Sequence, residues 1–436
     1  MNAENRESRK TTGLVKGPLI VYVLCLAVFA VTMWNRLGES SHDNHYVYMA
    51  EAMLDGRFHI EGNPPHRNDW AQYGDKWYVS FPPAPAILMM PGVAVWGLDF
   101  NDRIFTLLLA AAAPALLLLL LQMMASRGRI SRKPWEMGLL ATLYALGTVY
   151  FFSAVQGSVW YTAHITGSVM LLLHLILSLD GRRPILAGLF LGLAFACRPP
   201  MLMAFPLFLY EMLRAHADDD ADNIFRWVSS AVRNAGFAKI VRRVVLFGIP
   251  VLVVIGLLML MNWARFDDPF EFGHGHLKVR QTARIAKWGL FHYHYLPHNL
   301  GIVLTSLPWI SAEAPHIKVS LHGLALWFTT PVFLWLLWPA QRTRHYMWAA
   351  FTVALVALPS LLYQNSGWVQ FGCRFSLDYT PILVLMLAIG GRKFGKLLVA
   401  GVVFSIVINL FGAVTFDRMW KYYATGKDRD RIYQPD

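Results

Sequence analysis

The stretch at residues 104–133, IFTLLLAAAAPALLLLLLQMMASRGRISRK, decides the class of fold. Residues 104–125 carry no charge. A basic cluster follows them directly, made of Arg127, Arg129, Arg132 and Lys133. An α-helix needs roughly 20 apolar residues to cross the hydrocarbon core of a bilayer, and loops rich in Lys and Arg stay on the cytoplasmic side. The stretch therefore predicts a membrane-spanning helix whose C-terminal end faces the cytoplasm.

The composition of the whole chain agrees with this interpretation. Apolar residues make up 56% of it, the mean hydropathy is +0.40, and only 15% of the residues are charged. A soluble domain carries about a quarter charged residues, so the apolar excess must face lipid. The net charge of +12 comes from Lys and Arg in short loops between apolar runs, which does not favour nucleic-acid binding. Cys25, Cys197 and Cys373 are scattered, which argues against a disulfide framework or a metal cluster.

Similar apolar runs recur along the chain. Candidate spans lie at about 17–35, 104–125, 136–153, 162–179, 243–263, 321–338, 346–363, 376–391 and 394–415. The first follows basic residues and lacks a small-residue cleavage site, so we expect residues 1–16 to form a cytoplasmic tail before an uncleaved span.

Charge also decides two ambiguous stretches. If Ala84–Leu98 crossed the membrane, the basic cluster 127–133 would lie outside, so we expect a helix on the outer surface there. Pro184–Tyr210 has basic residues at both ends and is broken at Cys197-Arg198-Pro199-Pro200, since two prolines interrupt a helix. It is therefore expected to form a helical hairpin with Arg198 near the apex.

The sequence thus predicts an all-α polytopic membrane protein with about eleven membrane segments, helices lying on the periplasmic surface and no large soluble domain. The transmembrane domain covers 17–416. The expected outer segments are 36–103, 264–320, 364–375 and the tail 417–436. The stretch 214–243 is expected to connect spans in the cytoplasm, with an amphipathic helix at Ile224–Val241. No internal repeat is visible.

Asp43, in Ser-His-Asp-Asn-His-Tyr, is the first candidate for chemistry. A helix is predicted just after it, ending at Gly56. Asp43 can be the N-cap of that helix or a general base that accepts a proton from an attacking hydroxyl, and the two roles are compatible. The flanking His42 and His45 are either metal ligands or polar interfacial residues.

Two arginines lie in apolar surroundings. Arg198 is in the hairpin, and Arg374 is where the last outer loop re-enters the membrane. Each either pairs with an acid or binds a phosphate group, because a guanidinium matches phosphate oxygens. Lys76, beside a predicted turn at Gly74-Asp75, is expected to be exposed. Further candidates for lining a polar cavity are His42, His45, Tyr78, Gln156, His164, His292 and His294.

Taken in order, these features resemble the GT-C superfamily of polytopic membrane glycosyltransferases, in particular its bacterial protein-mannosyltransferase-like and lipopolysaccharide glycosyltransferase-like branch. The resemblance spans about 17–416. The motifs that carry it are Asp43 in the first outer loop, Tyr73-Gly-Asp-Lys-Trp-Tyr-Val-Ser-Phe-Pro-Pro-Ala-Pro, Gly188-Leu-Phe-Leu-Gly-Leu-Ala-Phe-Ala-Cys-Arg-Pro and Phe371-Gly-Cys-Arg-Phe-Ser-Leu-Asp-Tyr-Thr-Pro.

The resemblance implies an enzyme that transfers a sugar, with inversion, from a polyprenyl-phosphate donor to a glycan, lipid or protein acceptor. It assigns the catalytic acid position to Asp43 and a basic donor-binding position to Arg198. It also implies an active site on the periplasmic side of the inner membrane, with a divalent metal, Mg²⁺ or Mn²⁺, as a possible cofactor. Some members place Glu-Lys before the double proline, whereas Ser80-Phe81 stands here. Lys76 or Arg374 would then supply the missing charge.

The alternative function is a transporter or lipid flippase, which would use the buried arginines as a substrate path. The missing repeat and the concentration of polar residues at one membrane face favour the enzyme. A scaffold without catalysis would leave Asp43 and Arg198 unexplained.

Overall fold

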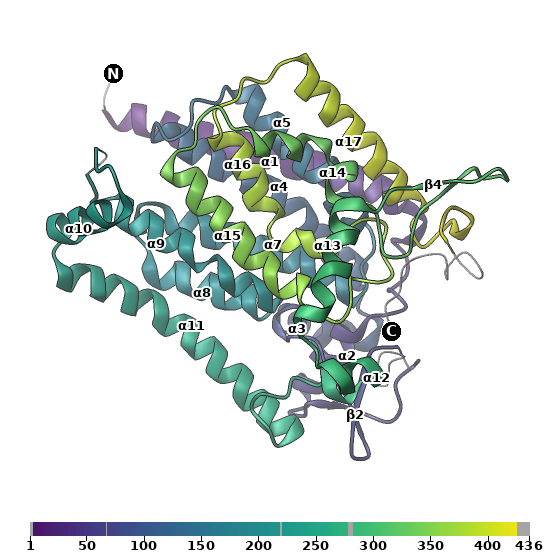
Figure 1. The fold of residues 1–436 in the computed structure, drawn as a ribbon. Helices are drawn as coiled ribbons and strands as arrows, with labels where there is room; N and C mark the ends of the chain where they lie inside the picture. The colour runs from purple at the N-terminus through teal and green to yellow at the C-terminus, as the bar shows by residue number, and fades with distance from the viewer. Residues whose placement is uncertain (1–2, 67, 219, 278–281, 425–436) are drawn as a thin grey trace.

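The computed structural model describes residues 3–66, 68–218, 220–277 and 282–424 (Figure 1). Parts of five predicted segments lie outside the described residues: positions 1–2 of the N-terminal tail, 67 of the first outer loop, 219 of the cytoplasmic connection, 278–281 of the second outer loop and 425–436 of the C-terminal tail.

Long helices form the body of the protein. Within the described residues, five helical segments are long and apolar enough to cross a membrane, Val15–Arg36, Asp102–Ser126, Val159–Gly181, Phe237–Phe266 and Lys396–Thr415. They belong to α1 (Ala3–Met33), α4 (Asp102–Ser126), α7 (Val159–Ser178), α11 (Phe237–Phe266) and α17 (Lys396–Thr415). The predicted spans at these places are confirmed as helices, but the count of about eleven is not. Helix α1 packs on α4, α4 on α7, α7 on α8, and α8 on α11.

Other predicted spans are shorter or interrupted. The stretch 136–153 divides at Gly147 into α5 (Pro134–Leu146) and α6 (Tyr150–Ala154). The prediction of one helix over 321–338 is wrong, because α14 (Leu326–Thr329) ends before Pro331, where a 3-10 helix begins. Helix α15 (Arg344–Leu361) is continuous, and α16 (Thr380–Ile389) follows the 3-10 helix Arg374–Asp378.

The predicted hairpin is present. Helix α8 (Pro184–Phe195) ends before Arg198, a 3-10 helix covers Pro199–Ala204, and α9 (Phe205–Arg214) runs back, so that Arg214 pairs at 2.7 Å with Asp180 near the start of α8. A Cβ atom at Gly188 would lie 2.0 Å from the carbonyl oxygen of Phe247, so only glycine allows α8 and α11 to cross this closely.

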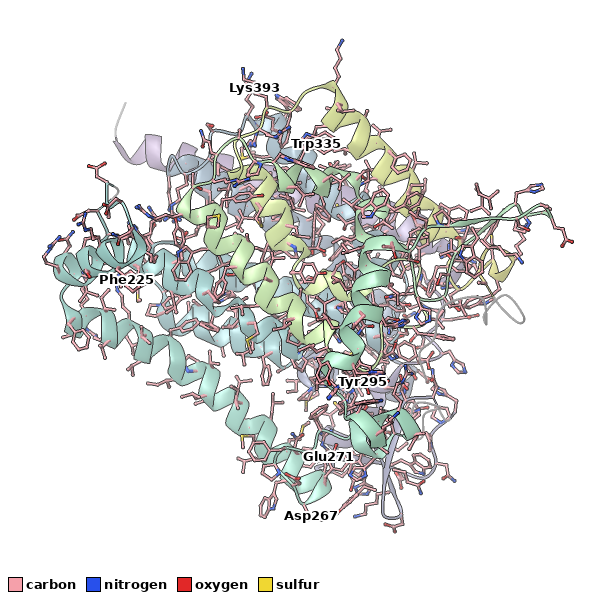
Figure 2. All side chains as sticks on the ribbon, viewed as in Figure 1. Phe225, Asp267, Glu271, Tyr295, Trp335 and Lys393 are labelled. Carbon is pink, nitrogen blue, oxygen red and sulfur yellow. The ribbon has the colours of Figure 1, made fainter. Side chains whose placement is uncertain are left out.

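The amphipathic helix after α9 is shorter than predicted. Helix α10 (Ile224–Ala235) ends at Gly236, whose φ of 83° stops the helix before α11 begins, so it does not reach Val241. Helix α11 exposes Leu252, Leu257 and Leu260 by 60% or more, as expected of a face that contacts lipid. Figure 2 shows side chains projecting along the outer side of α11.

The fold is mostly helical, as predicted, and the outer loops add two small sheets. Strands β1 (His59–Ile60), β3 (Lys76–Val79) and β2 (Trp70–Tyr73) form a sheet in that order, and β2 pairs with β3 across the predicted turn at Gly74. A second sheet pairs β4 (Trp309–Ile310) with β5 (Ile317–Lys318). These strands are too short for their alternation to stand out from a polar loop.

The first loop folds as a unit on the helix ends. It contains the three-stranded sheet, α2 (His45–Leu54) and α3 (Ala84–Trp96), and their shared core includes Tyr46, Trp70 and Val79. Figure 1 shows α2, β2 and α12 (Thr282–Trp288) at one end of the molecule, with α13 (Leu296–Thr305) above them. Helix α10 and the 390–395 turn lie toward the other end, where Arg129 pairs with both Asp180 and Glu211. The predicted inner and outer loops therefore occupy opposite ends.

Candidate functional site

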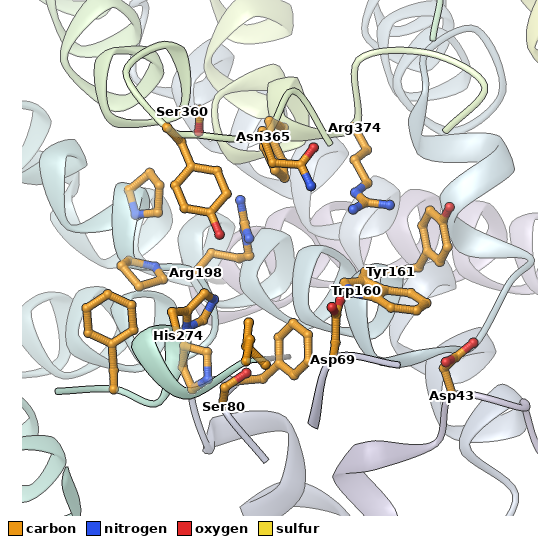
Figure 3. Close-up of a pocket in the computed structure, with 18 of the residues that line it drawn as sticks. Asp43, Asp69, Ser80, Trp160, Tyr161, Arg198, His274, Ser360, Asn365 and Arg374 are labelled. Carbon is orange, nitrogen blue, oxygen red and sulfur yellow. Dashed lines mark hydrogen bonds between the residues drawn. The ribbon is translucent and has the colours of Figure 1, made fainter. Parts of the chain in front are cut away.

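A cavity of about 1260 Å³ lies where the first loop covers the ends of the helices (Figure 3). Its wall combines the first loop, the start of α7, the turn after α8, the end of α11 and the segment between α15 and α16. Asp43, Arg198 and Arg374 all line it, although they are far apart in the sequence. The double proline Pro82-Pro83 also lines it, and the peptide N–H of Ala84 donates to the carbonyl of Ala196 at 3.0 Å. All three motif strings therefore meet Asp43 at this cavity.

Asp43 is held mainly through its backbone. Its carbonyl accepts a hydrogen bond of 2.9 Å from the N–H of Val159, one of the free N–H groups at the start of α7. The N-cap interpretation of Asp43 is wrong, because Asn44 occupies that position of α2 and makes no side-chain cap. The Asp43 carboxylate instead accepts a hydrogen bond of 3.1 Å from Asn68. The carboxylate thus remains directed toward the cavity.

Two histidines flank this carboxylate. The ring nitrogens of His42 and His66 each lie 3.6 Å from an Asp43 oxygen, and the ligand atoms of all three residues lie within 4.8 Å of one another. Two imidazoles and one carboxylate are a donor set that suits Zn²⁺, whereas Mg²⁺ prefers oxygen ligands. The group therefore does not fit the Mg²⁺ or Mn²⁺ that the family resemblance allowed, since both prefer oxygen ligands.

Arg198 is paired with an acid. Its Nε and Nη2 atoms donate to the two oxygens of Asp378 at 3.2 and 3.0 Å, and His164 Nδ1 lies 2.9 Å from the same carboxylate. Asp378 and His164 are completely buried. Of the two interpretations of Arg198, pairing is therefore present, and the carboxylate offsets its charge toward the cavity.

Arg374 differs, because no carboxylate among the described residues pairs with it. Its Nη1 atom donates to the carbonyl of Val369 at 3.1 Å, and its buried Nε atom has no hydrogen-bond partner among those residues. The guanidinium carbon lies 5.4 Å from the ring centre of Tyr161 and 5.9 Å from that of Trp160. Arg374 therefore presents to the cavity a charge that no ion pair among the described residues neutralises, although Asp69 in the same wall interacts with it electrostatically from farther away.

Most residues of the wall were not selected from the sequence, and three of them carry titratable groups that the first loop, the end of α11 and the segment after α11 bring to the cavity. Asp69 accepts a hydrogen bond of 2.9 Å from the Trp160 indole, and burial raises the pKa of its carboxyl group although that hydrogen bond opposes the rise. His274 lies across from it, and burial lowers the pKa of its imidazole to about 4, so it is neutral at pH 7. Arg265, at the end of α11, donates to the carbonyl of Val79 at 2.8 Å. Asp69 and His274 belong to polar loops and Arg265 resembles an interfacial anchor, so no pattern distinguishes them.

The remaining candidates are divided. His42 and Gln156 line the cavity, and Gln156 accepts a hydrogen bond of 2.9 Å from Arg36. The other predicted lining residues, His45, Tyr78, His164, His292 and His294, are not in its wall.

Packing explains where these side chains lie. His45 stacks on Trp70 at 4.2 Å, and Tyr78 packs at 5.2 Å on Phe266. The rings of His292 and His294 pack against Trp288, with ring centres 4.9 and 4.4 Å from that of the indole.

Lys76 is exposed, as predicted, but does not line the cavity. It begins β3 beside the turn of the hairpin, so the prediction that it contacts a donor phosphate in this cavity has no geometric support.

The fold and the cavity define a helical membrane protein with a charged cavity at one end of its helices. No protein-family model matches the chain, and no curated protein matches it. Two solved structures of the oligosaccharyltransferase of Archaeoglobus fulgidus can be superposed on it. The apo form gives a TM-score of 0.41 at 13% identity, over 93% of this chain and 56% of that one. The complex of AglB with an inhibitory peptide and a dolichol-phosphate gives 0.43 at 12% identity, over 94% and 56%. The chain thus aligns with little more than half of those proteins, and at these scores neither structure identifies its function.

Proposed function

We propose that this protein is a membrane glycosyltransferase that moves a sugar from a polyprenyl-phosphate donor to an acceptor hydroxyl at the periplasmic face. The observation that carries the proposal is that the Asp43 carboxylate faces one cavity together with the Arg374 guanidinium, which forms no ion pair among the described residues. This reaction requires two groups: a carboxylate that accepts the proton of the acceptor hydroxyl, and a cation that stabilises the leaving phosphate.

The donor lies with its phosphate at Arg374. Arg198 contributes less, because Asp378 already offsets its charge. The lipid chain leaves the cavity along α11, where Ile255, Leu258 and Met259 provide an apolar wall. A lipid-linked donor cannot leave the bilayer, which explains why the site is in a membrane protein.

The reaction is a single displacement, so the sugar carbon inverts. Asp43 accepts the proton of the acceptor hydroxyl as the oxygen attacks the anomeric carbon, and the bond to the phosphate oxygen breaks. Arg374 stabilises the negative charge that develops on the departing phosphate, where a preorganised cation has its largest effect. No step passes through a metal ion.

A transporter or lipid flippase would need a path between the two faces of the membrane. At the opposite end from the cavity, Arg129 is paired with Asp180 and Glu211, and both Glu211 and Arg129 are largely buried. This packing favours the enzyme.

Mass spectrometry of extracellular glycans and glycolipids tests the proposal. Asp43→Asn should remove one glycan or lipid modification while leaving expression and membrane insertion unchanged. The matched control is Asp75→Asn, which changes an exposed acid of the same loop outside the cavity. Normal modification in the Asp43→Asn strain would exclude Asp43 as the base.

A further inference from the structure

Asp69 is a carboxylate that the protein's own contacts do not explain. It is enclosed on most sides yet lines the cavity, and the Trp160 indole is its one hydrogen-bond donor among the described residues. No cation within those residues forms an ion pair with it. Enclosing a carboxylate that has a single hydrogen-bond donor and no ion pair is costly, and Arg374 acts on Asp69 only from farther away. A second carboxylate oxygen therefore remains available to a molecule in the cavity.

The backbone at Asp69 is also in an uncommon conformation. Its φ of 55° lies in the left-handed region, which aspartate tolerates better than most residues but which still costs free energy. Such conformations persist where the surrounding structure fixes them, and they concentrate at functional sites. Here the strand β2 begins at the next residue, Trp70, whose side chain is buried, so the chain direction is fixed on that side. The fold holds the Asp69 carboxylate toward the cavity.

Figure 3 shows Asp69 between Asp43 and His274, with Trp160 alongside and Arg374 across the cavity. In the proposed reaction, the donor phosphate is at Arg374 and the acceptor hydroxyl is at Asp43. The sugar ring must then occupy the space between these two groups. Trp160 and Asp69 form the wall of that space.

We propose that Asp69 and Trp160 bind the sugar ring of the donor, and that this sugar is uncharged. The inference rests on the proposed function. Ring hydroxyls donate hydrogen bonds to the free oxygen of Asp69, and the ring lies against the flat face of the indole. Asp43 and Asp69 are both acids, so a uronic acid would be repelled. Asp69 thereby selects the sugar, whereas Arg374 binds any polyprenyl phosphate.

Binding measurements on the full-length protein in lipid nanodiscs separate these roles. The probes are decaprenyl phosphate alone and decaprenyl phosphate carrying glucose, mannose, arabinose, N-acetylglucosamine or glucuronic acid. The wild-type protein should bind at least one neutral sugar lipid more tightly than the bare lipid, and should not prefer the glucuronic acid lipid. Asp69→Asn and Asp69→Ala should weaken binding of the preferred sugar lipid about 10- to 150-fold, the value of one hydrogen bond to a charged group. Their binding of bare decaprenyl phosphate should not change.

Several outcomes overturn the inference. Equal weakening of both probes would mean that Asp69 only supports the loop, and unchanged binding of both would mean that it does not touch the sugar. A wild-type preference for the glucuronic acid lipid would also exclude it. If the wild-type protein bound no polyprenyl phosphate, the proposed function itself would be wrong. That outcome is recognised from the wild-type protein alone, without the Asp69 variants.

A second measurement does not depend on the folding of the Asp69 variants. Deoxy analogues of the preferred sugar lipid, each lacking one hydroxyl, are bound to the wild-type protein. At least one analogue should bind with about tenfold or more lower affinity, because a site built to bind a hydroxyl rejects the ligand that lacks it. Equal binding of every analogue would overturn the proposal.

Discussion

Replacing Arg374 and Arg198 in turn distinguishes a cation that binds donor from one that supports the fold. Arg374 forms no ion pair with an acid among the described residues, so Arg374→Gln removes a charge that is free to bind the donor phosphate. One hydrogen bond to a charged group contributes about 1.5–3 kcal/mol. With 1.4 kcal/mol per tenfold change, the affinity for decaprenyl phosphate should fall about 10- to 150-fold. The melting temperature should change little.

Arg198→Gln should have the opposite result. It leaves Asp378 with a fully buried carboxylate and removes its bidentate partner at 3.0 and 3.2 Å. Breaking a buried pair by removing one member costs about 3–5 kcal/mol of stability. The double variant Arg198→Gln/Asp378→Asn removes both charges and should recover part of that loss.

Binding is measured with decaprenyl phosphate in nanodiscs, and stability is measured by thermal unfolding in detergent. Unchanged binding by Arg374→Gln would refute its assignment to the donor phosphate. If Arg265→Gln then weakened binding instead, the phosphate would lie at the end of α11. A large loss of stability in Arg374→Gln, with none in Arg198→Gln, would contradict the assignment of Arg198 to the structural ion pair and of Arg374 to ligand binding.

Three further predictions concern packing, metal binding and pH. Gly188→Ala should destabilise the protein by about 1–3 kcal/mol, because the new methyl group meets the α11 backbone, whereas Gly256→Ala in open space should not lower the melting temperature. Zn²⁺ should inhibit sugar transfer by binding the Asp43 carboxylate, His42→Ala should relieve this inhibition, and inhibition that persists in the variant would contradict it. Burial raises the pKa of the Asp69 carboxyl group, so the folded protein loses stability as the pH rises above the ordinary carboxyl pKa near 4 and the buried group becomes charged. Asp69→Asn should therefore melt at a higher temperature than wild type at pH 7.5, with a smaller difference at pH 4.5, and a difference that grows toward acid would have the wrong sign.

The long helices could be predicted because two independent signals agree along the sequence. Uncharged runs have the length that a bilayer requires, and basic clusters mark their inner ends. The stretch 321–338 shows where this fails. Its composition is apolar, but Pro331 interrupts the helix, and an average of hydropathy does not show whether a helix is continuous. The turn at Gly74-Asp75 could be predicted, but the four-residue strand β2 was missed, because a short hairpin depends on the packing of Trp70 and Val79 against α2 and α3 more than on its own pattern.

The same contrast governs the site. Arg198 and Arg374 could be selected because a charged residue in an apolar run is rare. Asp69 could not, because an acid in a polar loop has no such contrast. The partner of Arg198 also could not be predicted, because Asp378 follows Arg198 by 180 residues and only the fold brings the two side chains together.

That buried pair also explains why two of the arginines that line the cavity, Arg198 and Arg374, differ in character. Asp378 connects the turn after α8, through Arg198, to α7, through His164. It also ends the 3-10 helix that begins with Arg374, while His164 is one turn of α7 beyond Trp160. The ion pair therefore fixes the position of Arg374 relative to Trp160, and a catalytic cation is effective only when its position is set before the reaction. If this is correct, Arg198→Lys, which keeps the charge but loses the bidentate geometry, should lower the turnover of sugar transfer more than the affinity for decaprenyl phosphate. An equal effect on both would place Arg198 on the phosphate itself.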